Sequence, residues 1–170
     1  MMTWTSHSEA DIRCKNPPGP VRAGELVARL LHTRNSDPHQ DTFLSKDFFP
    51  PRGGAISNVC GASSGFSVDR CDQLSDDDLR ARAKAFAASR NNGRVSKGAI
   101  VASVDDLRGI RVTGSPDEQV VFVYDDPKYD DPKDPNEEHA VVRVRASVDR
   151  TDWDDLRDKI RKAFRRSVSP

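Results

Sequence analysis

The chain has 170 residues, of which 35% are hydrophobic, and a mean hydropathy of -0.71. These values fit a single modest core and exclude a wholly disordered chain, because the apolar residues gather in periodic segments. The 27 basic and 27 acidic residues cancel, so no global field attracts nucleic acid or an anionic membrane.

The targeting and cysteine patterns favour a cytoplasmic protein. No apolar run approaches the roughly 18 residues of a membrane span, and the N-terminus lacks the pattern of a signal peptide. Cys14, Cys60 and Cys71 have no paired spacing, which argues against a disulfide framework or a structural zinc site. We therefore expect a reducing compartment.

The first part of the chain predicts a leader followed by a helix. Residues 1–20 are polar and end in a proline-rich stretch, so we expect a flexible leader ahead of one domain over residues 21–170. Leu26 and Leu30 lie at helical spacing, which predicts the first helix over Val21–Thr33. His32 then falls in the last turn of that helix.

Further along, strand and helix signals occur in irregular order. The alternating segment Phe66–Arg70 predicts a strand. Ser75 followed by three aspartates predicts a helix N-terminus, and the helix is expected to end at Asn91–Gly93. Gly98–Ala102 reads as a short buried strand, and Ser103–Arg108 as a brief capped helix.

The C-terminal third predicts a hairpin and a last helix. Gln119–Tyr124 and His139–Ala146 are the strands of the hairpin, and the helix covers Asp152–Arg166 with Thr151 as its cap. Without a sustained alternation of strands and helices, the expected fold class is α+β. We predict a small, mostly antiparallel sheet of three to five strands with about three helices packed on it.

The loop over Asp125–Glu138 contains seven carboxylates and three prolines in fourteen residues. Such a loop can attract a hard cation, but the ligand spacing and the glycine of a calcium loop are missing, so a solvated insert is favoured. Asp130 and Asp131 of this loop are candidate contacts for a basic partner. Arg165 and Arg166, at the end of the last helix, are candidate contacts for an acidic or phosphate-bearing partner.

Two histidines and two arginines are candidates for catalysis. His32 and His139 can serve as general base and acid, with Arg70 or Arg108 holding an anion. This set would suit a small metal-independent enzyme that acts on RNA or a nucleotide, provided that the histidines meet. The alternative interpretation is that they are ordinary residues at the ends of elements.

The sequence contains no nucleophile elbow, phosphate-binding glycine loop or metal-ligand spacing, so we expect no cofactor and no metal. The first hypothesis is a non-catalytic protein-interaction or regulatory module of a bacterial cytoplasmic assembly. Its expected partner is another protein, with nucleic acid at the C-terminal basic helix as an alternative and no membrane. The small enzyme is the second hypothesis.

Overall fold

The computed structural model describes residues 21–34, 66–90, 93–125, 136–144 and 148–170, and these residues form an α+β fold. Six antiparallel strands make one open sheet in the order β4-β5-β2-β1-β3-β6. The strands are β1 (Leu26–Arg34), β2 (Phe66–Arg70), β3 (Arg94–Ser103), β4 (Val121–Asp125), β5 (His139–Val144) and β6 (Arg166–Val168). The helices are α2 (Asp76–Ala88), α3 (Val104–Arg108) and α4 (Trp153–Ala163). The expected fold class is confirmed, although the sheet has more strands than the predicted three to five.

The helix predicted over Val21–Thr33 is wrong, because Leu26–Arg34 form strand β1 in the interior of the sheet. Both faces of β1 are covered. Val27 packs into the core beneath α3 and α4, whereas Ala28 packs beneath α2. A strand buried on both faces carries consecutive apolar residues, and such a run also satisfies a helical spacing.

The strands predicted at Phe66–Arg70 and Gly98–Ala102 are confirmed, and so is the hairpin of β4 and β5. In the hairpin Val123 lies opposite Val142. All six residues of β5 are buried, which fits its place between β4 and β2.

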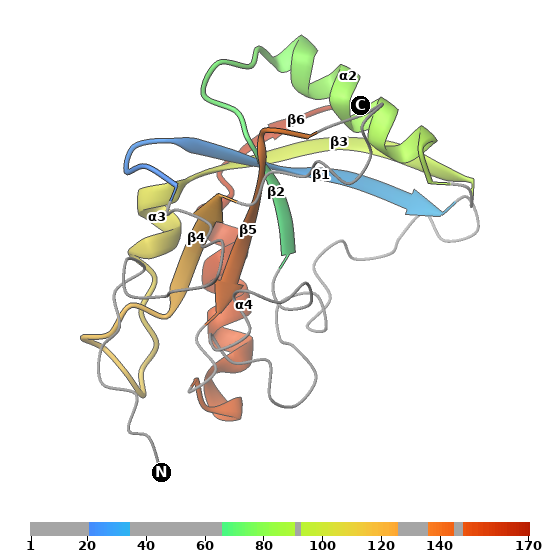
Figure 1. The fold of residues 1–170 in the computed structure, drawn as a ribbon. Helices are drawn as coiled ribbons and strands as arrows, with labels where there is room; N and C mark the ends of the chain where they lie inside the picture. Colours follow the sequence, from blue (N-terminus) through green and yellow to red (C-terminus); the bar gives the residue numbers. More distant parts are fainter. Residues whose placement is uncertain (1–20, 35–65, 91–92, 126–135, 145–147) are drawn as a thin grey trace, which may run out of the picture.

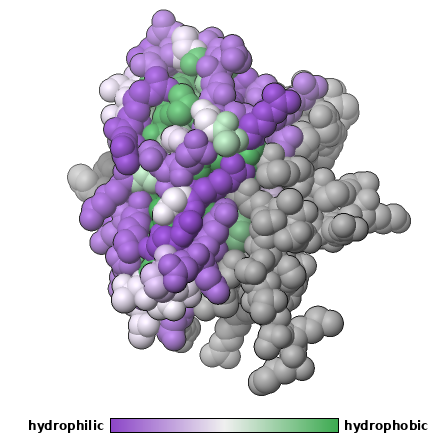
Figure 2. All heavy atoms as spheres, turned by 90° about the vertical axis from the view of Figure 1, so that its left-hand side faces the viewer, coloured by the Kyte–Doolittle hydropathy of each residue, from purple (hydrophilic) through white to green (hydrophobic). Residues whose placement is uncertain are grey.

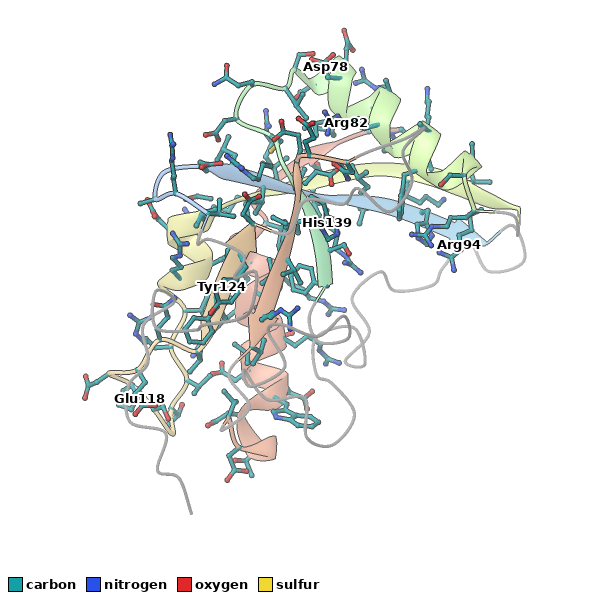
Figure 3. All side chains as sticks on the ribbon, viewed as in Figure 1. Asp78, Arg82, Arg94, Glu118, Tyr124 and His139 are labelled. Carbon is teal, nitrogen blue, oxygen red and sulfur yellow. The ribbon has the colours of Figure 1, made fainter. Side chains whose placement is uncertain are left out.

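Helix α2 begins as the sequence predicts. The Ser75 side chain accepts from the backbone N–H of Asp78, and the Asp78 side chain accepts from the backbone N–H of Ser75. These reciprocal bonds satisfy two amides that the first turn leaves open. Figure 3 shows the Asp78 side chain at the start of α2.

The C-terminal region differs from its prediction at both ends. Thr151 lies in a short 3-10 turn, Arg150–Asp152, and α4 begins at Trp153 after Asp152, whose side chain makes no capping bond. The helix ends at Ala163, so Arg165 and Arg166 lie beyond it. Arg166 opens β6, a strand of three residues that the sequence did not predict.

The sheet has two halves that meet in a narrow junction. Strands β1 and β2 pair through Val27↔Arg70 and Ala28↔Asp69, and Figure 1 shows β2, β4 and β5 crossing β1 and β3 steeply. Helix α2 covers β1, β3 and β6 on one face, while α4 lies along the β2, β4 and β5 half on the other. No helix in this described part of the chain is long and apolar enough to cross a membrane.

Strand β6 depends on a glycine in β3. Gly98 has a φ of 82°, and a Cβ at this position would lie 1.9 Å from the carbonyl oxygen of Val168. Gly24 has nearly the same φ, 81°, but a Cβ there would meet no atom within 4 Å. The two glycines share a backbone conformation that disfavours side chains, and only Gly98 also permits a close approach of backbones.

Candidate functional site

Arg70, a predicted anion holder, lies at the end of β2 in an ion-pair network. Its Nε is 2.8 Å from Oε2 of Glu25, and its Nη1 is 3.3 Å from Oδ1 of Asp125. The hydrogen bond to Glu25, with burial opposing it, raises the pKa of Arg70. Glu25 itself is buried, so the guanidinium neutralises a carboxylate that would otherwise be costly to bury.

Arg108, the other predicted anion holder, supports the edge of the sheet. Its Nη2 donates to the carbonyl oxygens of Val21 and Val123, the latter at 3.3 Å. The backbone N–H of Val21 also donates to Val123. Because β4 is an edge strand, these bonds satisfy a carbonyl that another chain could otherwise pair with.

His139 begins β5 and lies directly opposite Asp69 of β2. Both residues are buried, with 9% and 6% of their surface exposed. Asn136 Nδ2 donates to Oδ1 of Asp69 at 3.0 Å, and Nη1 of Arg82, from α2, is 3.9 Å from Oδ2. Figure 3 shows Arg82 on α2 above His139. This polar group therefore joins α2 to the start of β5.

His32 belongs to a second group, which we call the cationic cluster: His32, Phe86, Arg90 and Arg94. Nη1 of Arg94 is 2.8 Å from Nε2 of His32. The Phe86 ring centroid lies 5.3 Å from that of His32, and Arg90 Cζ lies 4.6 Å from the Phe86 centroid. The cluster thus combines β1, the end of α2 and the start of β3.

The electrostatics of the cluster keep His32 neutral. Burial lowers the pKa of His32, and the positive charges of Arg94, Arg90 and Arg29 lower it further. Since a guanidinium can only donate, Nε2 of His32 is the acceptor and the ring proton lies on Nδ1. The imidazole therefore adds no charge, and its ring N–H donates to the backbone carbonyl of His32.

The two candidate histidines lie in different parts of the sheet. His139 faces Asp69, Asp69 faces Ala28, and His32 is four residues farther along β1. With about 3.3 Å per residue and about 4.8 Å between strands, the two backbones are roughly 16 Å apart. Figure 3 likewise shows His139 far from Arg94, the neighbour of His32.

The predicted partner-binding residues are only partly described. Arg165 Nη2 is 3.4 Å from Oδ1 of Asp106, and Arg166 Nη1 is 3.0 Å from Oδ1 of Asp76. Both arginines are exposed and both face a carboxylate of this chain. Asp130 and Asp131 lie outside the described residues, as do the leader over residues 1–20 and most of the acidic loop.

Two further features limit the chemistry of the described residues. Burial raises the pKa of the Cys71 thiol to about 12, so the thiol stays protonated at neutral pH. No group of three or more metal-ligating side chains occurs within the described ranges.

Figure 2 shows a mostly hydrophilic surface on the side of α3 and β4, with apolar residues in small patches.

Sequence reasoning missed Phe86, Arg90 and Arg94 as site residues. The available signal was their spacing, because Phe86 precedes Arg90 by four positions and the residue types of Asn91–Gly93 favour a turn before Arg94. The part played by His32 was hidden, since its segment was assigned to a helix.

Comparison of the chain with family models, with curated proteins and with solved structures gave no match.

Proposed function

We propose that this chain is a non-catalytic interaction module, and that its cationic cluster binds an acidic segment of a partner protein. The observation that carries this proposal is a contrast among the arginines. Arg70 and Arg108 are occupied by groups of this chain, whereas Arg90 and Arg94 face no carboxylate within ion-pair distance among the described residues.

Unmatched surface guanidinium groups suit the binding of carboxylates. Each carries five N–H donors in a planar fork, and complementary charge contributes both to specificity and to the rate of association. Arg90 is stacked on Phe86, and Arg94 is bonded to His32. Both side chains are therefore already oriented, which lowers the entropy that binding would cost.

The enzyme hypothesis has one observation in its favour, which is the buried pair of His139 and Asp69 beside Arg82. A histidine next to a carboxylate is a common acid–base arrangement. Against it, His32 lies roughly 16 Å away along the sheet, and Arg70 and Arg108 already have partners. If His139→Ala abolished a ribonuclease or nucleotide-cleaving activity of the purified chain, the interaction module would be the wrong choice.

The proposal is tested with a short fluorescent peptide in which aspartate alternates with glycine, and with a matched peptide that has asparagine in place of aspartate. Fluorescence anisotropy of the full chain should show binding of the aspartate peptide only. The double variant Arg90→Gln/Arg94→Gln should weaken that binding at least about tenfold, because two charge-assisted contacts are lost.

The matched control is Arg165→Gln/Arg166→Gln, which changes the net charge equally on another surface. It should retain the affinity of the unmodified chain. Loss of binding in this control, with binding kept in Arg90→Gln/Arg94→Gln, would move the site to the C-terminal arginines. Absence of binding by the unmodified chain would remove the proposal.

A further inference from the structure

The charge balance of the cationic cluster identifies the chemistry of its ligand more closely. Arg70, Arg80, Arg157, Arg165 and Arg166 each lie within ion-pair distance of a carboxylate of this chain. Arg90 and Arg94 do not, as far as the described residues extend, and His32 between them is neutral. The cluster therefore offers two positive charges that no carboxylate of the described residues pairs with.

Most of the donors of Arg94 are also unused. Its one hydrogen bond within the described structure runs from Nη1 to His32, and its Nε is buried without an acceptor. A guanidinium has five N–H donors, so the donors of Arg94 other than the buried Nε–H and the one bonded to His32 can serve an outside acceptor.

We propose that the partner segment recognised by the cationic cluster carries a phosphorylated side chain, whose phosphate monoester binds Arg90 and Arg94. This inference rests on the proposed function and narrows its ligand. A phosphate monoester carries about -1.5 to -2 charges near neutral pH and three strong acceptor oxygens. One such group matches both guanidinium charges, whereas a single carboxylate matches one.

The surroundings of the cluster favour a single phosphate over a nucleic-acid backbone. The N-terminal end of α2 carries exposed Asp76, Asp77 and Asp78. The 13 residues of α2 place these acids roughly 20 Å from the cluster. Arg166 and Arg80 pair with Asp76 and Asp77, which leaves no excess positive charge at that end to hold a chain of phosphates running along α2. The formal net charge of zero gives no compensating field.

The experiment uses the acidic peptide described above in three forms, with phosphoserine, aspartate or serine at one central position. We expect the phosphoserine peptide to bind at least about tenfold more tightly than the aspartate peptide, since charge-assisted bonds to phosphate are stronger and more numerous. Arg90→Gln/Arg94→Gln should remove this preference, and Arg165→Gln/Arg166→Gln should keep it.

A second readout does not depend on affinity alone. Bound phosphate offsets the arginine charges that depress the pKa of His32, so NMR titration should show a higher pKa of His32 with the phosphoserine peptide. The serine peptide, which keeps only its aspartates, should raise the pKa of His32 less than the phosphoserine peptide does. A histidine that does not respond to the phosphoserine peptide would place the phosphate elsewhere and overturn the inference.

The outcomes separate the inference from the proposed function. Equal binding of the phosphoserine and aspartate peptides would refute phosphate recognition and leave the acidic partner standing. Failure of all three peptides would refute both. Tighter binding of a single-stranded RNA oligonucleotide, lost in Arg90→Gln/Arg94→Gln, would assign the cluster to nucleic acid and refute the phosphopeptide.

Discussion

Replacing Gly98 by alanine tests how closely β6 lies against β3. The added Cβ would stand 1.9 Å from the carbonyl oxygen of Val168, a backbone atom that cannot rotate away. The variant must therefore shift β6 or release it. Gly24→Ala is the matched control, because Gly24 has the same positive φ and open space where the Cβ would lie.

The expected loss of stability has two parts, which are the cost of the positive φ and the cost of releasing β6. A positive φ costs a non-glycine residue about 1–2 kcal/mol, and this cost should describe Gly24→Ala in full. Releasing β6 would also expose the buried Val168, at about 1.5–3 kcal/mol. Gly98→Ala should thus lower the free energy of unfolding by roughly 2.5–5 kcal/mol.

Urea unfolding followed by circular dichroism measures both variants, and a truncated chain ending at Arg165 supplies the second background. Without Val168 the steric term disappears, so Gly98→Ala should then cost no more than Gly24→Ala. Equal destabilisation by the two substitutions in the full chain would refute the close approach of β6 to Gly98.

Three further predictions concern other parts of the fold. Ser75→Ala should destabilise the chain by about 1 kcal/mol. The hydrogen bonds of Ser75 hold the pKa of the Asp78 carboxyl below its ordinary value. The stability that this cap contributes is therefore complete above the ordinary pKa and is lost as the pH falls through the lowered one. A pH series of urea unfolding that shows no such decline would contradict this prediction. Because burial raises the pKa of the Cys71 thiol to about 12, iodoacetamide should label Cys71 only in the unfolded chain. Peptide mass mapping detects the label. Arg70→Ala should cost about 1–2 kcal/mol by leaving Glu25 unpaired, and a double-mutant cycle with Glu25→Gln should give a coupling energy clearly different from zero.

The elements that the sequence predicts well are those decided by neighbouring residues. The start of α2 follows from Ser75 and Asp78, which bond to each other three positions apart. The brief helix α3 likewise begins where the Ser103 side chain accepts the backbone N–H groups of Asp105 and Asp106. Local capping of this kind is visible without knowledge of the rest of the fold.

The elements that the sequence misses are decided by distant partners. The apolar run of β1 is long because β2, β3 and both helical layers surround it, and its spacing alone does not separate a buried strand from a helix. Strand β6 has three residues, which form a strand only because β3 lies beside them. Strand β3 lies beside both β1 and β6 in the sheet, but it is adjacent to neither of them in the sequence.

The cationic cluster was hidden for the same reason. With His32 assigned to a helix end, nothing in the sequence brought it to Phe86 or Arg94. The register of β1 and β3 does so by placing His32 opposite Ser96, two residues from Arg94. The ion pairs of Arg70 with Glu25 and Asp125 are also a product of strand order.

The short junction between β1 and β2 has a consequence for how disturbance spreads through this protein. Within the sheet, two residue pairs connect the portion beneath α2 to the portion that carries α4. The Arg70 network, the contact of Arg82 with Asp69 and the packing of Val27 are the side-chain connections between them. Local opening can therefore occur in one portion while the other stays closed. Amide hydrogen exchange would then divide into two sets of rates, with the boundary at Val27 and Ala28.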